Sequence, residues 1–171
     1  TDVGRFFYFY PMPKEDLTVT EAQKKLEYYC AYQERCHLEV SIKLNALGII
    51  PAAQEQIIGH LIEQNYLNEG RYAKSFARGK FRIKKWGKER IVRELKGKKL
   101  SAYNIQLGLR EIDDKLYLET IEELAKKFWQ THPNKSLSMR KKKVFDALKY
   151  RGWESTLIYD CLTRLEHHSN S

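Results

Sequence analysis

"IVRELKGKKL", residues Ile91–Leu100, is one of three copies of a pattern that decides the fold of this chain. The other copies are "VSIKLNALGI", residues Val40–Ile49, and "VFDALKYRGW", residues Val144–Trp153. In each copy an apolar residue is followed four places later by a leucine. Four places after that comes a glycine, or a lysine in the middle copy, and then another apolar residue. Successive copies start 51 and 53 residues apart, and a period of this size indicates an internal repeat.

Each copy predicts a short helix that ends in a tight turn. Apolar residues four places apart lie on one face of a helix, and a glycine just beyond them is typical of a helix C-terminus. The segment from Thr18 to Glu21 has the form of a capping box, Pro51 suits a first helical position, and Ser101 suits an N-cap. An apolar pair follows every copy, and a longer helical pattern precedes each one, at residues 21–35, 71–85 and 116–131.

We therefore predict an all-α protein of three tandem three-helix repeats, with about nine helices. Because a unit of about fifty residues cannot bury its apolar face alone, the repeats are expected to stack into an elongated, curved array. The aromatic run Phe6–Tyr10 is compatible with a strand, with an arm packed on the body, or with an exposed partner site. The predicted parts are an aromatic N-terminal arm (1–17), a first repeat (18–67), a basic second repeat (68–114), and a third repeat with a short polar tail (115–171).

The composition predicts a soluble protein without a membrane segment. Of 171 residues, 42% are hydrophobic and 31% charged, and no apolar run approaches the roughly 18 residues that cross a bilayer. The N-terminal residues lack a signal-peptide cleavage pattern, so we expect a cytoplasmic protein. The three cysteines, Cys30, Cys36 and Cys161, have no short paired spacing, which favours buried, reduced thiols over a disulfide framework.

The net charge of +9 is concentrated in one region. Residues 71–99 hold thirteen basic and two acidic side chains, whereas the rest of the chain holds 18 basic and 20 acidic ones. On a helix from Arg71, four residues (Tyr72, Phe76, Gly79 and Ile83) share one face, which we expect to be core, and Gly87 is expected to end the helix. The opposite face then carries Arg71, Lys74, Arg78, Arg82 and Lys85.

This basic face predicts a binding surface. Solvated helix faces usually mix charge signs, because like charges one turn apart repel by a few tenths of a kcal/mol. A polyanion or an acidic partner would relieve that repulsion. The cluster Arg140–Lys143 is equally compatible with an ordinary solvated face. The candidate binding residues are Arg71, Lys74, Arg78, Lys80, Arg82, Lys84, Lys85, Lys88, Arg90 and Arg93, with Arg140, Lys141, Lys142 and Lys143 in the third repeat.

No catalytic or metal constellation is predicted. Gly87-Lys88 lacks the spacing and the following Ser or Thr of a phosphate-binding loop. The single Glu34-x-x-His37 motif is half of what a carboxylate metal site needs. Adjacent carboxylates, such as Glu122-Glu123, do not converge on one substrate when they lie on a helix. We therefore expect a protein that is not an enzyme and needs no cofactor or metal.

The segment Tyr66–Ser101 resembles the RecX family, regulatory proteins that bind and restrain the recombinase RecA. The likeness covers about residues 18–167. The chain departs from the family pattern at three places. Trp86-Gly87-Lys88 stands where Tyr-Gly-Pro is more typical, Lys99 stands where a glycine is expected, and residues 68–70 lack the usual run of acids. The likeness rests on Glu69, Arg71, Tyr72, Ala73, Phe76, Trp86-Gly87, Ile91 and Glu94-Leu95.

The resemblance implies an all-helical modulator that lies in the groove of the RecA–DNA filament. There it would bridge protomers and suppress ATP hydrolysis and strand exchange, thereby modulating recombination and DNA repair. The expected partner is the RecA nucleoprotein filament, with single- or double-stranded DNA as a further contact, no membrane, and a monomeric protein.

Two other interpretations remain open. A stand-alone DNA-binding protein could present a helix–turn–helix within Arg90–Ile112 to the major groove. Its second helix, residues 102–110, is poor in side chains that read bases, having only Asn104, Gln106 and Arg110. A helical adaptor for an acidic protein is the third interpretation.

Overall fold

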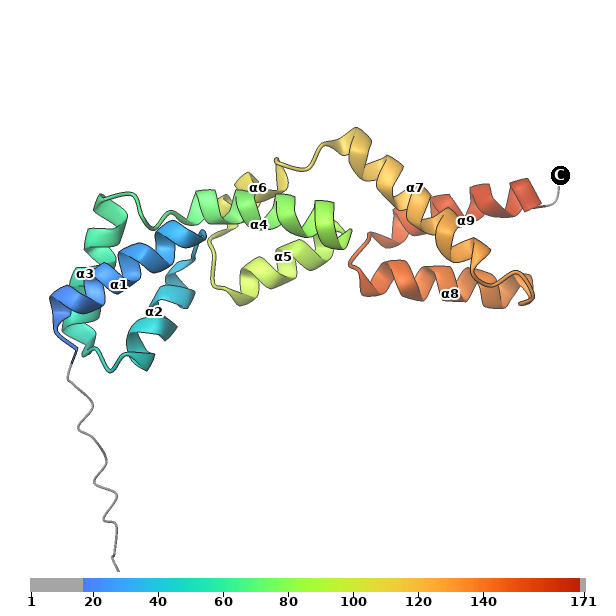
Figure 1. The fold of residues 1–171 in the computed structure, drawn as a ribbon. Helices are drawn as coiled ribbons and strands as arrows, with labels where there is room; N and C mark the ends of the chain where they lie inside the picture. Colours follow the sequence, from blue (N-terminus) through green and yellow to red (C-terminus); the bar gives the residue numbers. More distant parts are fainter. Residues whose placement is uncertain (1–16, 170–171) are drawn as a thin grey trace, which may run out of the picture.

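The computed structural model describes residues 17–169, and every regular element in this part of the chain is an α-helix. Figure 1 shows the helices as three three-helix units in an elongated row, so the predicted all-α tandem repeat is confirmed. The first repeat contains α1 (Val19–Tyr32), α2 (His37–Ala46) and α3 (Pro51–Glu63); the second contains α4 (Glu69–Lys84), α5 (Lys88–Gly97) and α6 (Ala102–Leu109); the third contains α7 (Asp114–Gln130), α8 (Leu137–Tyr150) and α9 (Ser155–Ser169).

Part of the N-terminal prediction cannot be placed, because Phe6–Tyr10 lies outside the described residues. The residue boundaries of the arm and the repeats stay a prediction. None of the helices within residues 17–169 is both long enough and apolar enough to cross a bilayer.

The same turn ends the second helix of every repeat, as the sequence pattern predicts. Gly48, Lys99 and Gly152 have positive φ angles of 74°, 62° and 80°. In all three turns the next residue donates its N–H to the carbonyl of the leucine five places back, at 3.2 Å. Lys99 takes the left-handed conformation that glycine adopts without steric cost, so the middle copy keeps the turn despite its different residue.

Two hydrophobic cores run through the array. The first repeat has its own core, whereas the second and third repeats share one, to which the first repeat adds Cys36 and Leu38. Trp153 is fully buried in the shared core, stacks on Tyr117 at 4.4 Å, and donates its indole N–H to the Lys85 carbonyl at 3.2 Å. The second and third repeats are therefore joined through buried apolar side chains.

The three cysteines are free thiols buried in these cores, which confirms that prediction. Burial raises the pKa of Cys30 to about 11 and raises the pKa of Cys36 and of Cys161 above the ordinary range. The three side chains therefore act as small apolar residues at neutral pH.

The predicted core face of α4 is correct for Tyr72, which is buried, and for Phe76, which packs against the core, but it is wrong for Ile83. The buried residues of α4 are Tyr72, Ala73, Ala77 and Phe81, whereas Ile83 is 76% exposed. The reason is that α4 packs closely on α6 through small residues. A Cβ added at Gly108 would lie 2.7 Å from the Ala73 carbonyl oxygen, so only glycine permits this approach. The pattern of large residues therefore misled the assignment, and the alanines mark the true interface.

Two helix ends also differ from the prediction. The helix α1 stops at Tyr32 rather than near Arg35, because the chain becomes extended at Gln33 and leads the buried Cys36 into the shared core. The helix α4 ends at Lys84, where Lys85 takes the left-handed conformation with φ 53°. Gly87 does not end α4 but is the N-cap of α5.

Candidate functional site

The fourteen basic residues predicted as a binding surface divide into two groups in the structure. One group is held by partners inside the protein, and the other has no such partner. The second group is free to meet another molecule without the loss of any contact inside the protein.

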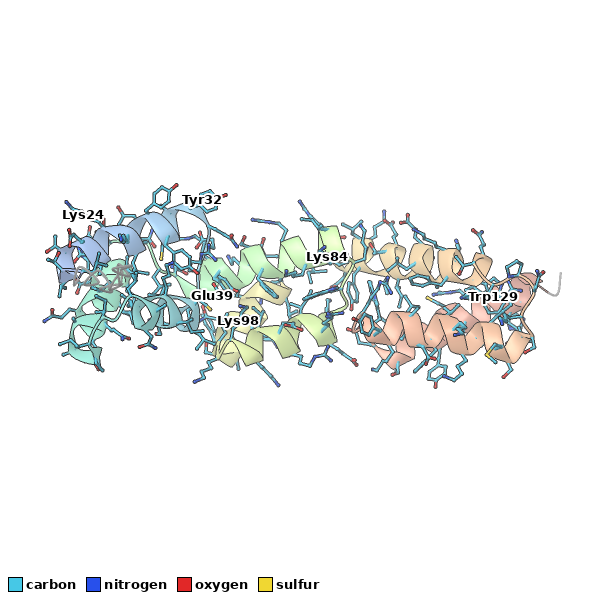
Figure 2. The ribbon with its side chains drawn as sticks, turned by 60° about the horizontal axis from the view of Figure 1, so that its bottom comes forward. Lys24, Tyr32, Glu39, Lys84, Lys98 and Trp129 are labelled. Atoms are coloured by element: carbon cyan, nitrogen blue, oxygen red, sulfur yellow. The ribbon has the colours of Figure 1, made fainter. Side chains whose placement is uncertain are left out.

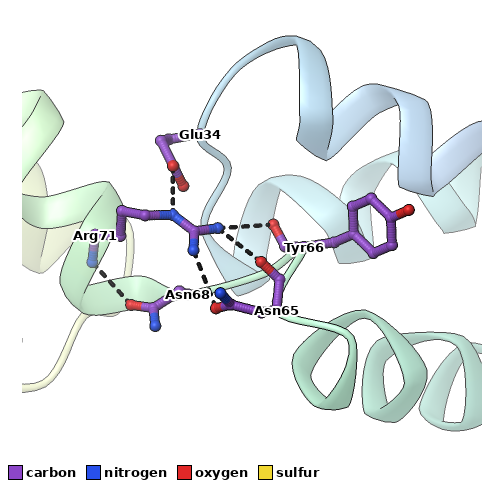
Figure 3. A network of polar contacts seen from close by, with 5 residues as sticks. All are labelled: Glu34, Asn65, Tyr66, Asn68 and Arg71. Atoms are coloured by element: carbon purple, nitrogen blue, oxygen red, sulfur yellow. Dashed lines mark hydrogen bonds and ion pairs between the residues drawn. The ribbon is translucent and has the colours of Figure 1, made fainter.

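Arg71 belongs to the first group and joins the first two repeats (Figure 3). Its guanidinium pairs with the Glu34 carboxylate and donates hydrogen bonds to the Asn65 side chain at 3.0 Å, the Asn65 carbonyl at 2.9 Å and the Tyr66 carbonyl at 3.4 Å. The Asn68 side chain caps α4 by accepting from the Arg71 backbone N–H at 2.8 Å. Arg71 therefore stabilises the contact between the first and second repeats, the first joint, and is not available to a partner.

Lys88 and Arg90 hold the joint between the second and third repeats. The Lys88 amine lies 2.8 Å from the Asp114 carboxylate, and this hydrogen bond holds the pKa of Asp114 below its ordinary value. Arg90 lies over the Trp86 ring, 4.0 Å from its centroid, and donates to the Tyr150 carbonyl at 3.2 Å. Both cations are therefore structural.

The cluster in α8 is also mostly held within the third repeat. Arg140 donates to the Trp129 carbonyl at 3.0 Å and lies over its ring. Lys141 pairs with Glu166, and Lys142 lies 2.7 Å from the Asp146 carboxylate one turn away. These contacts account for three of the four cations of the cluster without an external ligand.

Lys74 and Arg78 share one carboxylate. The Lys74 amine lies 3.8 Å and the Arg78 guanidinium 3.5 Å from the oxygens of Glu111, just beyond the end of α6. Their mutual repulsion is relieved by this residue from outside their own helix. Both side chains remain exposed, so the pairing is weak.

Six predicted cations have no hydrogen-bonding or ion-pairing side-chain partner within residues 17–169. The amine of Lys80 lies 5.2 Å from the ring centroids of both Phe76 and Trp86. The other five side chains are exposed. These five are Arg82, Lys84 and Lys85 at the end of α4, Arg93 in α5 and Lys143 in α8. The free positive charge therefore concentrates on the second repeat.

An open groove of about 430 Å³ lies beside α4. Phe76, Ile83 and Trp86 give it an apolar floor, and Gly79 lies among them. Figure 2 shows Glu39 and Lys98 together where the first two repeats meet, and Lys84 near the third repeat; all three line the groove. The four residues predicted as the core face of α4 thus line a groove, and its other lining residues include Glu34, Glu39, Glu94 and Lys98 from segments outside α4.

The Glu39–Lys98 pair is the polar centre of the first joint. Its carboxylate accepts from the Lys98 amine at 2.7 Å and from the Tyr72 hydroxyl at 3.2 Å, and it also accepts the Cys36 backbone N–H. Burial acts to raise the pKa of Glu39, but these hydrogen bonds and the Lys98 charge outweigh it and lower the pKa below 4.5. The joint is therefore strongest with this carboxylate ionised.

We expect Glu39→Gln to destabilise the protein by about 1–3 kcal/mol at pH 7, because a partly buried hydrogen bond to a charged group is lost. A lowered carboxylate pKa stabilises the fold above the ordinary pKa, and this contribution disappears as the pH falls through the lowered value. Urea unfolding of both proteins between pH 7 and pH 3 should therefore show the difference shrinking in acid. A constant difference would assign the effect to packing instead of charge.

Comparison with known proteins identifies the family to which this arrangement of helices belongs. Residues 68–109 match the family model for the second three-helix domain of RecX, and residues 115–162 match the model for its third three-helix domain. The chain belongs to the RecX family. The two matched segments thus lie in the two repeats that share one core, and the first of them includes the whole of α4.

Curated RecX relatives agree with this assignment. The chain is 33% identical over 129 residues to the regulatory protein RecX of Lactobacillus johnsonii, which covers 75% of this chain and 48% of the relative. It is 30% identical over 138 residues to the regulatory protein RecX of Lactobacillus gasseri, which covers 81% of this chain and 51% of the relative. The chain thus spans about half the length of these RecX relatives.

Solved RecX structures have the same fold. A crystal structure of RecX from Lactobacillus salivarius superposes with a TM-score of 0.77 at 25% identity and covers 86% of this chain and 96% of that one. A second RecX crystal structure also gives a TM-score of 0.77, at 23% identity, covering 85% of this chain and 73% of that one. The row of three-helix repeats is therefore a RecX architecture.

Proposed function

We propose that this chain regulates a RecA recombinase by binding in the groove of the RecA–DNA filament. It acts there by contact with the filament, without catalysis, and slows ATP hydrolysis and strand exchange. Its location in the cytoplasm, where it works as a monomer, is part of the same proposal.

The observation that carries this proposal is the concentration of free cations on the second repeat. Arg82, Lys84, Lys85 and Arg93 are exposed and have no carboxylate partner among the described residues. They sit on a body whose second and third repeats share one core, so their positions relative to one another are fixed. Fixed cations along an elongated protein suit a polyanion with repeated sites, such as a nucleoprotein filament.

The elongated shape supports contact with more than one protomer. The three repeats follow one another along a single row (Figure 1), so surfaces on the first and third repeats are far apart. A binder that contacts two neighbouring protomers resists their relative motion. The expected effect is on filament ATP hydrolysis and strand exchange together.

The test is ATP hydrolysis by a bacterial RecA on single-stranded DNA while this protein is titrated in. We expect inhibition that saturates at less than one copy per RecA protomer, because one elongated molecule would contact several protomers. The control titration uses RecA without DNA, which should show no comparable change in its low basal rate. Unchanged hydrolysis, together with tight sequence-specific binding to duplex DNA alone, would favour the helix–turn–helix interpretation.

A further inference from the structure

The groove beside α4 contains apolar surface that the protein's own side chains leave uncovered. Ile83 is 76% exposed although it lines the groove together with Phe76 and Trp86. The Phe76 and Trp86 rings meet edge to face at 6.4 Å, so the floor is a preformed surface. Large apolar side chains exposed in a concave, polar-rimmed site are typical of protein interaction sites.

Gly79 keeps the middle of this groove open. A glycine inside a helix destabilises it relative to alanine. At Gly87 and Gly108 the packing explains the residue, because an added Cβ would lie 2.2 Å and 2.7 Å from backbone atoms. At Gly79 no atom lies within 4 Å of that position. The glycine therefore leaves room for another molecule to approach the backbone of α4 closely.

The charges around the groove favour a protein segment over a nucleic acid. Three amines and three carboxylates line it, so a phosphodiester strand would meet as many negative groups as positive ones. The Arg90 guanidinium lies 4.0 Å and the Lys80 amine 5.2 Å from the centroid of the Trp86 ring, so these cations cover part of the ring, and Ile83 provides the most exposed apolar surface of the groove. The amines are those of Lys80, Lys84 and Lys98, and the carboxylates those of Glu34, Glu39 and Glu94.

The charges are also segregated along the groove. Glu34 and Glu39 are already paired with Arg71 and Lys98 at the end near the first repeat, and the third carboxylate, Glu94, lies 3.9 Å from the Arg90 guanidinium. Lys80 and Lys84 have no carboxylate partner in the described part of the chain. A ligand carboxylate is therefore attracted to one end of the groove only, and this fixes the direction in which a segment lies.

We propose that the groove docks a segment of a partner protein that places one large apolar side chain against Phe76, Ile83 and Trp86. A carboxylate a few residues away in that segment pairs with Lys80 and Lys84. The identification of this partner as a RecA protomer rests on the proposed function. The kind of segment that the groove binds is inferred from the lining residues alone.

The test uses a displayed library of random peptides of about twelve residues, selected on the 171-residue chain. Selected peptides should combine Leu, Ile, Phe or Trp with Asp or Glu one to four residues away. Gly79→Leu fills the groove and improves helix propensity, and it should weaken a labelled selected peptide at least tenfold in fluorescence anisotropy. Gly59→Leu is the matched control, because Gly59 is a helical glycine in α3 with equally open surroundings, and it should change the affinity less than twofold.

A second variant tests the electrostatic half of the proposal. The double substitution Lys80→Gln, Lys84→Gln should weaken the same peptide about tenfold and reduce the dependence of its affinity on salt. A labelled oligothymidine is the second probe, and its affinity should be unchanged by Gly79→Leu.

Three results would overturn the proposal: no acidic–apolar consensus among selected peptides, selected peptides that bind Gly79→Leu as well as wild type, or an equal loss of oligothymidine binding. The last result would make the groove a nucleic-acid site. If the peptides behave as expected but the wild-type protein does not inhibit RecA, the peptide-binding proposal is supported and the proposed function is contradicted.

Discussion

Gly87→Ala should destabilise the joint between the second and third repeats by about 3 kcal/mol or more. An added Cβ would lie 2.2 Å from the Gly152 carbonyl oxygen and 2.6 Å from the Trp153 Cα, and backbone cannot move aside as a side chain can. The Gly87 N–H also donates to the Arg151 carbonyl at 2.9 Å, so separation of the two segments loses this bond. Urea unfolding followed by near-ultraviolet circular dichroism measures the loss, since Trp153 packs at this joint.

The control for this prediction is Gly79→Ala, which should stabilise the protein by about 0.5–1 kcal/mol because alanine favours the helix and no atom crowds the site. The backbone of Gly87 has φ −75°, which any residue adopts, so its loss of stability cannot come from conformational strain. Equal effects of the two substitutions would mean that Gly87 and Gly152 are not in contact in solution.

Reversal of three free cations, Arg82→Glu, Lys85→Glu and Arg93→Glu, should raise the concentration for half-inhibition of RecA ATP hydrolysis at least about 100-fold. A loss of about 1 kcal/mol of binding free energy at each of three sites adds to about 3 kcal/mol, which corresponds to a factor of at least roughly 100 in affinity. The slope of log affinity against log salt should flatten by about 2 to 3, since three phosphate contacts disappear. Lys84 is left unchanged because it lines the groove, so this experiment and the groove experiment address different surfaces.

The matched control reverses Lys24, Lys126 and Lys127, which changes the net charge by the same amount. These side chains are exposed and have no ion-pair partner among the described residues, and Lys24 lies at the far end of the first repeat (Figure 2). Inhibition should persist within about threefold. If both variants lose inhibition equally, total charge and not the surface of the second repeat governs binding.

The fold could be predicted from the sequence because its determinants are local. The leucine and the turn residue lie four positions apart, and the turn hydrogen bond links residues five apart, as in Leu95 and Leu100. The capping box of Thr18 and Glu21 likewise spans three positions, and the structure contains both of its hydrogen bonds. Interactions of this range leave a signature in a single sequence.

The functional surface could be predicted only in part, because its determinants are not local. Glu39 and Lys98 are 59 positions apart, and Arg71 and Glu34 are 37 apart, so composition alone could not separate structural cations from free ones. The α4 interface was missed because it depends on Gly108, a residue in another helix. The assignment of the predicted cations to contacts with RecA or DNA stays a proposal.

The separate core of the first repeat makes the molecule unevenly stiff along its length. Bending between the second and third repeats would open an apolar core around Trp153, whereas bending at the first joint would break the ion pairs of Arg71 and Lys98 and expose only Cys36 and Leu38 of that core. Polar joints of this kind yield at lower free energy than apolar cores. A curved partner would therefore bend the protein more at the contact between the first and second repeats than at the contact between the second and third.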